Sequence, residues 1–159
     1  MRTGRTGAAA KAGHDLVLRV NSWGASLEVG EGPAPTSVEL TADATSLRVQ
    51  KGTGGMQALG DDDRASIHQT IDEDVLERQD ITFSSTGVER RGDVLSVQGE
   101  LTLVGKTEPV TFDLVIGDDG TLSATAVVTQ PAWGIKPYSA LFGALKVADD
   151  VEVVLDGHL

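Results

Sequence analysis

The chain has 159 residues, enough for one hydrophobic core, and we expect residues 1–159 to form a single domain. It carries 13 Lys and Arg against 24 Asp and Glu, and the formal net charge of −11 argues against non-specific binding to nucleic acid or anionic lipid. There is no Cys, which excludes disulfides, zinc–thiolate sites and iron–sulfur clusters.

The first 13 residues are basic, but their only apolar run is Ala8–Ala10, far short of the core of a signal peptide. No later apolar run approaches the roughly 18 residues of a membrane-spanning helix. We therefore expect a soluble, cytoplasmic protein without an integral membrane segment.

Short runs of alternating apolar and polar residues come next in the chain. They are bounded by Gly, Pro, Asn or Asp, and each predicts a short β-strand with one apolar face. These runs lie at residues 16–20, 27–29, 38–40, 47–49, 81–83 and 151–155.

Residues 62–78 depart from the alternation and predict one amphipathic α-helix. The Asp triplet at 61–63 is expected to cap its N-terminus, and Arg78 to lie in its last turn, where each charge suits the helix dipole. The apolar positions at helical spacing are Ile67, Ile71, Val75 and Leu76.

The clearest alternation spans residues 94–104, 110–116 and 122–128. Residues 105–109 and 118–120 are rich in turn formers and are expected to connect these three segments. The sequence therefore predicts an antiparallel meander of three strands.

Eight or so antiparallel strands cannot leave their apolar faces in water, and one helix is too small to cover them all. An all-β fold in which the sheet closes into a barrel removes this exposure and also the free strand edges. A two-sheet sandwich is the competing solution, and periodicity does not decide between the two.

Several sequence patterns resemble phosphate-binding, catalytic or metal-binding motifs but have simpler structural explanations. Residues 99–107 resemble a phosphate-binding loop, yet the spacing is wrong and the segment lies in a hairpin. Ser66 and His68 lie on the predicted helix without a nucleophile elbow, and the three His are far apart in sequence. We expect no catalytic residue, no metal site and no cofactor.

The acidic run 61–80 is interpreted as a solvated helix face or, alternatively, as a docking surface for a partner.

Residues 131–145 gather half of the six aromatic side chains without clean alternation. Trp133, Tyr138 and Phe142 either plug one end of the barrel or form the lip of an apolar cavity, where an indole or phenol could orient a polar headgroup. The sequence leaves both readings open.

The run ITFSSTGVERRGDVLSVQGELTLVGKTEPVTFDLVI, from Ile81 to Ile116, resembles the YceI family of lipocalin-like, polyisoprenoid-binding barrels. This run matches the family's pattern of a strand opening in an F-S-T signal, a long second strand, a G-x-T-x-P-V turn and a third strand. Further matches are D-x-x-R at 61–64, W-G-I at 133–135 and VADDVEVVL at 147–155. The resemblance implies a barrel of about eight strands with a helix across its opening, enclosing a cavity for an isoprenoid-tailed lipid. Many relatives are exported, whereas we expect no export signal here.

We therefore expect a non-enzymatic protein that binds, transports or sequesters an isoprenoid or other apolar lipid. The alternative is an acidic interaction or scaffold protein with a side-chain-filled barrel, docking a partner or forming a homodimer. An enzyme acting on lipid is the least favoured reading, because the inward rows carry no titratable group. The expected ligand-binding residues are Phe83, Leu95, Val97, Leu101, Leu103, Phe112, Leu114, Ile116, Leu122, Trp133, Tyr138 and Phe142.

Overall fold

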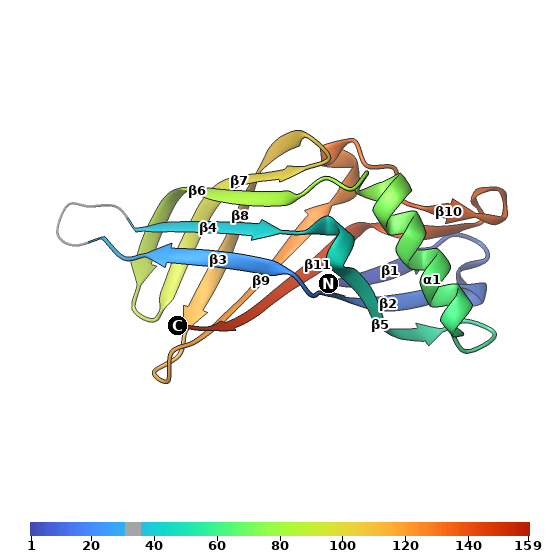
Figure 1. Ribbon diagram of the computed structural model, residues 1–159, viewed down its shortest axis with the longest axis horizontal. Coiled ribbons are helices and arrows are strands. Elements are labelled where there is room, and N and C mark those ends of the chain that lie inside the picture. Colours follow the sequence, from blue (N-terminus) through green and yellow to red (C-terminus); the bar gives the residue numbers. More distant parts are fainter. Residues whose placement is uncertain (31–35) are drawn as a thin grey trace.

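The computed structural model describes residues 1–30 and 36–159, most of them in a curled antiparallel sheet with one α-helix beside it (Figure 1). The strands are β1 (Arg2–Thr6), β2 (His14–Val20), β3 (Trp23–Glu28), β4 (Ser37–Ala42), β5 (Leu47–Gly54), β6 (Ile81–Arg91), β7 (Val94–Leu103), β8 (Lys106–Ile116), β9 (Thr121–Thr129), β10 (Ser139–Ala140) and β11 (Leu145–His158). The helical elements are α1 (Asp61–Thr70), its π-helical continuation η3 (Ile71–Val75) and four 3-10 turns, η1 (Ala10–Ala12), η2 (Ala44–Ser46), η4 (Gln130–Trp133) and η5 (Leu141–Gly143).

The sheet closes through one long, bent hairpin. Its strands are hydrogen-bonded in the order β3-β4-β6-β7-β8-β9-β11-β1-β2-β5, with β10 added beside β11. The two end strands belong to the same hairpin, because β3 continues β2 and β5 continues β4 in the chain. The antiparallel barrel is therefore confirmed.

Ten strands form this path where about eight are predicted; β1 has no counterpart among the predicted runs, and a bend divides two long strands into β2 with β3 and β4 with β5. Asn21 and Ser22 separate β2 from β3, and Asp43 with η2 separates β4 from β5. Hydrogen bonds from Asn21 N to Ser46 O (3.3 Å) and from Asp43 N to Ser22 O (3.0 Å) hold the two arms together across the bend. Two long strands thus become four short ones.

The central meander has the predicted faces but a shorter first connection. Val97 pairs with Phe112 and Leu95 with Leu114, which sets the apolar rows of β7 and β8 side by side. Strand β8 already begins at Lys106, so the expected connection at 105–109 is wrong. Only Val104 and Gly105 join β7 to β8, and both have the positive φ that a two-residue type I′ turn requires.

The predicted helix is present, with different ends. Gly60 precedes its first residue, and Asp63 accepts a hydrogen bond from Gly60 N at 2.9 Å, so the cap uses a single Asp of the triplet. The helical segment ends at Val75, and Arg78 lies beyond it with φ of 56°, bonded to Asp72 and Glu73. Within the described residues, no helix has the length and apolar character needed to cross a bilayer.

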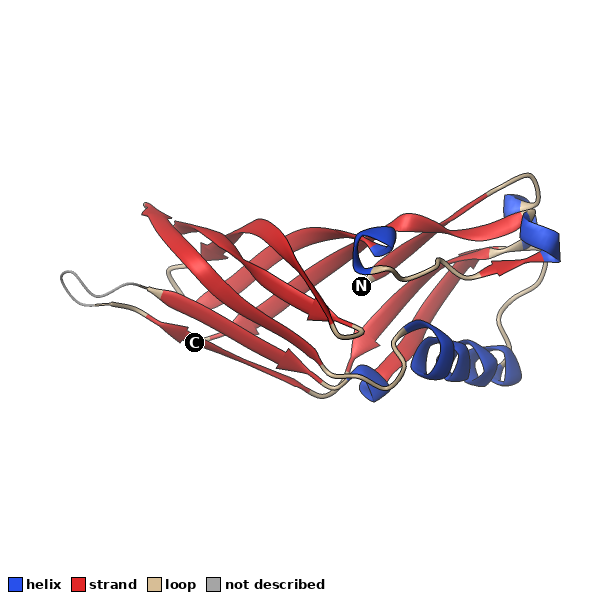
Figure 2. Cartoon of the chain, turned by 90° about the horizontal axis from the view of Figure 1, so that it is seen from above, coloured by secondary structure: helices blue, strands red, loops and turns tan. Residues whose placement is uncertain are grey.

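The interior contains two apolar clusters, one toward each end of the barrel. Figure 2 shows the length of the sheet between these ends, with α1 beside one of them. We call the first the filled half; its buried members are Val38, Phe83, Leu95, Val97 and Leu114. We call the second, beneath α1 and η3, the open half; its buried members are Leu18, Ala44, Leu47, Leu76, Leu103, Val128, Trp133 and Ile135.

Candidate functional site

The filled half packs most of the expected ligand-binding side chains against one another. The rings of Phe83 and Phe112 meet at a centroid distance of 5.3 Å with a 55° tilt, a favourable aromatic geometry. Leu95, Val97 and Leu114 are buried beside them, while Ile116 and Leu122 pack against the cluster from the barrel end. These residues are inward-facing, and their neighbours occupy the space around them.

Gly99 shows how tightly this half is closed. A Cβ atom at this position would lie 2.3 Å from Cζ of Phe83 and 2.5 Å from the carbonyl oxygen of Ser84. No side chain fits in that space, so the ring of Phe83 lies over the glycine. The missing apolar side chain in the alternation of β7 is thus replaced by an aromatic ring from β6.

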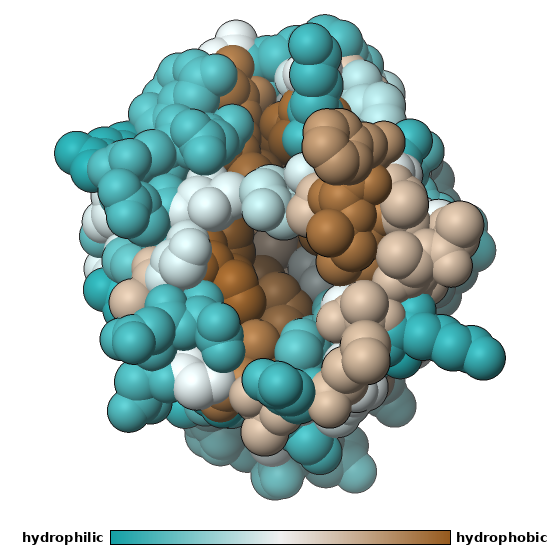
Figure 3. Space-filling view, turned by 90° about the vertical axis from the view of Figure 1, so that its right-hand side faces the viewer, coloured by the Kyte–Doolittle hydropathy of each residue, from teal (hydrophilic) through white to brown (hydrophobic). Residues whose placement is uncertain are grey.

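The open half is lined by apolar side chains that remain partly accessible to solvent. Leu103 and Trp133 are buried here, and Leu101 packs against both clusters. Figure 3, which looks onto this end, shows a hollow whose walls are largely hydrophobic. The partly buried members are Met1, Leu16, Val20, Val49, Ile71, Val75, Ile81, Leu101, Val104, Val110 and Val153.

Helix α1 forms one side of this opening and is fixed to the end strand β5. Arg64 Nη1 donates to Val49 O at 3.1 Å, and His68 Nε2 lies 3.3 Å from Thr45 O and 2.5 Å from Arg48 Nη1. Because β5 ends the hydrogen-bonded path, these contacts cover part of an exposed strand edge. The helix therefore protects the edge and places η3 over the apolar interior.

A slot in the barrel wall opens where β8 and β9 part. Their ladder is confined to Leu114–Ile116 and Leu122–Ala124, so the rest of β8 and β9 is not paired across this seam. The resulting cleft has a volume of about 380 Å³. Its lining residues are Glu108, Pro109, Val110, Thr111, Val127, Thr129, Ala132 and Trp133. Val110 and Trp133 also belong to the open half, but five of the eight lining residues are exposed, so this cleft lies on the outer surface beside that half.

The three aromatic residues of 131–145 occupy different environments. Trp133 is buried in the open half, and its Nε1 donates to Leu101 O at 2.8 Å. Tyr138 and Phe142 are exposed at the α1 end of the barrel. The structure thus places the indole in the wall and the other two rings outside the interior.

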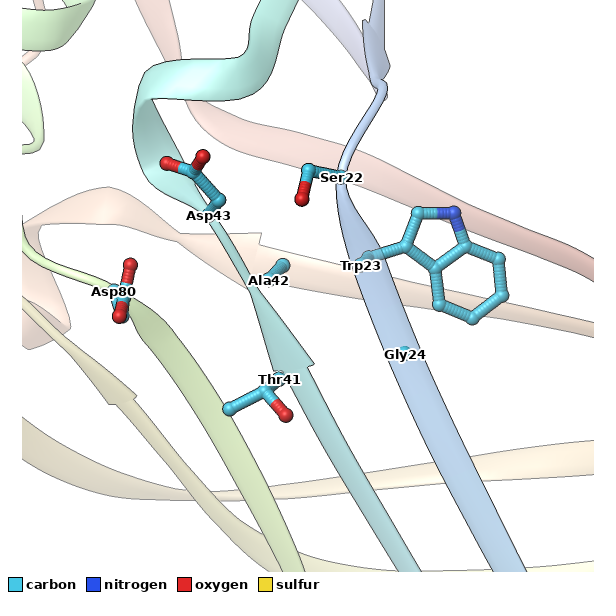
Figure 4. Close-up of a pocket in the computed structure, with 7 residues that line it drawn as sticks. All are labelled: Ser22, Trp23, Gly24, Thr41, Ala42, Asp43 and Asp80. Atoms are coloured by element: carbon cyan, nitrogen blue, oxygen red, sulfur yellow. The ribbon is translucent and has the colours of Figure 1, made fainter.

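A second surface pocket, of about 240 Å³, lies at the bend of the long hairpin (Figure 4). It is lined by Ser22, Trp23, Gly24, Thr41, Ala42, Asp43 and Asp80. The indole of Trp23 is directed away from the two carboxylates in Figure 4, so these polar groups do not converge on one point. Across the described residues, no three His, Asp or Glu side chains gather in a way that could hold a metal ion.

A family model for the YceI-like domain matches residues 5–159. The chain belongs to the YceI family. YceI-like proteins bind apolar ligands rather than act as enzymes. None of the curated proteins matches the chain in sequence.

Solved structures share this YceI fold at low sequence identity. BcnA of Burkholderia cenocepacia is similar over 98% of this chain and 93% of its own, with 18% identity and a TM-score of 0.63. The YCEI protein of Campylobacter jejuni is similar over 91% of this chain and 84% of its own, with 14% identity and a TM-score of 0.62. A mutant of the same protein gives 12% identity and a TM-score of 0.65 over the same shares.

The sequence pattern predicts no ligand-lining role for most of the open half. Leu16 and Val20 lie on a weakly patterned strand, and Ile71 and Val75 lie on the helix. Nothing in their spacing connects these two pairs with the apolar faces of the central meander. Their periodicities did indicate apolar faces. What the pattern lacked was the bend that brings β2, β5 and η3 around one opening.

Proposed function

We propose that this YceI-like protein binds an elongated apolar lipid, of isoprenoid type, in the open half of its barrel and carries or sequesters it without catalysing a reaction. The supporting observation is the hollow at the α1 end, which is lined by aliphatic side chains that are only partly buried. In this proposal residues 1–159 act as one barrel domain, and the cytoplasmic location stays a prediction.

The physical basis is burial of hydrocarbon. Each methylene removed from water contributes about 0.8 kcal/mol, so a chain of several isoprene units binds with few polar contacts. We propose that the tail lies between η3 and Trp133, with Leu101 and Leu103 as its floor.

The filled half has a different role in this proposal. Phe83, Phe112 and Val97 set the depth to which a tail can enter, because their packing closes the barrel below Leu101. The expected ligand contacts of Leu95, Leu114, Ile116 and Leu122 are then made only if the filled half opens. Contacts from Tyr138 and Phe142 to the ligand stay a prediction for its polar end.

A substitution pair on β2 tests this proposal. Val20 faces the open half and Val17 faces solvent on the same strand. Val20→Trp fills the hollow and is expected to weaken binding of a fluorescent polyprenyl analogue at least about tenfold, whereas Val17→Trp leaves binding unchanged. Equal affinities for the two variants, or a purified protein that yields no lipid on solvent extraction and binds no analogue, contradict the proposal.

One observation favours a second function, that of an acidic interaction protein. Asp61, Asp62 and Asp63 are exposed at the start of α1, and Glu73 and Asp74 are exposed on η3. Such a surface attracts a basic partner at low salt. The test is capture of a basic protein and its dependence on salt. Replacing these acids by Asn and Gln should abolish the capture while lipid binding persists, and this result would establish the second role beside the first. A homodimer stays a prediction.

A further inference from the structure

The rim of the open half differs from the rest of the chain in charge. Residues 6–13 and 130–148 contain Lys11, Lys136 and Lys146 and no acidic residue, whereas the remainder holds all 24 acids and ten of the 13 cations. The two segments lie together, because Ala9 N donates to Ala144 O at 2.8 Å. We call them the basic rim.

All three rim lysines are exposed, and no carboxylate within the described residues forms an ion pair with them. The acidic helix α1 lies across the open end from β10 (Figures 1 and 2). Electrostatic forces between exposed charges fade beyond about 8 Å at physiological ionic strength. A surface that meets the basic rim therefore experiences its lysines more strongly than the net charge of the chain.

Large apolar side chains protrude from the same rim. Phe142 is wholly exposed, Leu141 is 57% exposed and Tyr138 is 51% exposed. We call Leu141 and Phe142 the apolar tip. Figure 3 shows hydrophobic side chains gathered on one side of the hollow at this end.

The backbone holds the apolar tip outward at a conformational cost. Leu141 and Phe142 have φ of 51° and 55°, a left-handed conformation that L side chains rarely adopt. The turn is closed by Ala144 N donating to Leu141 O at 3.1 Å, and pairing of Ser139 with Lys146 fixes its base. Strain of this kind concentrates at functional sites.

We propose that the apolar tip and the basic rim form a docking surface for an anionic lipid bilayer. Leu141 and Phe142 would enter the boundary between headgroups and acyl chains, with Tyr138 at headgroup level and the lysines against anionic headgroups. The net charge alone argues against such binding, and the separation of charge along the rim is what permits it. Docking brings the hollow to the membrane surface, and it does not depend on whether the hollow holds a lipid.

The test is cosedimentation of the full chain with vesicles that contain no isoprenoid lipid. Vesicles of phosphatidylglycerol and phosphatidylcholine in equal amounts are expected to bind the protein, and binding should weaken as salt is raised. Vesicles of phosphatidylcholine alone should bind it weakly. Absence of binding to the anionic vesicles overturns the proposal, whatever the outcome of the polyprenyl assay.

Two variants and two matched controls locate the surface. Phe142→Asn should lower vesicle affinity about tenfold, and Asn suits the left-handed backbone, so the fold is expected to persist. The double variant Lys136→Gln and Lys146→Gln should lower it about twentyfold. Val29→Asn and Arg90→Gln, exposed positions away from the rim, should leave it unchanged.

Equal losses in the controls overturn the assignment to the rim. So does a parent protein that is dimeric in sedimentation velocity and becomes monomeric on Phe142→Asn, because a second copy then covers the apolar tip.

Discussion

The two halves of the barrel are built from the same kind of alternating strand, yet one is filled and the other is open. In the filled half two of the three Phe side chains meet, and the ring of Phe83 lies over Gly99. The open half has no Phe, and most of its apolar members are only partly buried. The same strand pattern therefore surrounds both a solid and a hollow interior, and what distinguishes them is which side chains meet across it.

The two halves should also contribute differently to stability and to ligand binding. The filled half supplies well-packed burial, which stabilises the fold, while the open half leaves apolar surface that a ligand can cover. Substitutions should therefore act mainly on stability in the first and on binding in the second.

A charge placed in the filled half should have the largest effect. Leu114 is 4% exposed, and Leu114→Asp is expected to lower the free energy of unfolding by about 4 kcal/mol, since a carboxylate would be buried without a partner. Urea denaturation followed by circular dichroism measures this. A variant that unfolds like the parent would show that the inward face of β8 is misassigned.

Identical truncations should separate the two halves. Leu95→Ala removes a buried side chain from the filled half and is expected to cost about 3 kcal/mol. Leu16→Ala removes a partly solvated one from the open half and should cost about 1 kcal/mol. Paired urea titrations give both values, and similar costs would mean that the open half is as tightly packed as the filled half.

The hydrogen bond of Trp133 should distinguish a wall residue of the open half from an exposed residue at its rim. Trp133→Phe removes the donor to Leu101 O and is expected to lower the free energy of unfolding by about 1 kcal/mol. Tyr138→Phe, at an exposed ring, should change it by less than about 0.5 kcal/mol. Thermal unfolding of the two variants distinguishes a wall residue from a rim residue, and a larger effect at Tyr138 would reverse that assignment.

The smallest effect should arise at the turn that closes the filled half. The Thr121 hydroxyl and then the Thr121 backbone N–H donate to Asp119 Oδ1, at 2.7 and 3.1 Å, and they lower the pKa of this carboxyl. Its contribution to stability is therefore present above the unfolded pKa of about 3.9 and is lost as the pH falls through the lower folded value. The parent should be slightly more stable than Asp119→Asn near neutral pH, with the difference shrinking under acid. A difference that grows under acid would contradict this sign.

Much of the fold could be predicted from the sequence because its signals are local. Alternation in β7, β8 and β9 identified strands and inward faces, and helical spacing at Ile71 and Val75 identified the helix. Strand β1 was missed, since Arg2–Thr6 has no apolar row and is held by pairing with β2 and β11. The resemblance to YceI supplied the barrel, which periodicity could not separate from a sandwich.

The candidate site was predicted less well, because its position depends on contacts distant in sequence. Alternation assigns the same role to every inward residue of β6 to β9, although Phe83 and Phe112 close one end against each other. It grouped Trp133, Tyr138 and Phe142 by proximity in the chain, although one is buried and two are exposed. Burial is a property of the assembled wall, so spacing alone does not report it.

By itself, the sequence determined antiparallel strands with one apolar face each around a shared aliphatic interior, because alternating side chains leave water only when those faces are covered together. Periodicity left a barrel and a two-sheet sandwich both open, and the resemblance to the YceI family favoured the barrel. The tertiary structure alone decided which part of that interior is solid, where β8 and β9 part, and which lysines share a rim with Phe142. Those features arise from register, bending and side-chain volume acting between segments far apart in the chain.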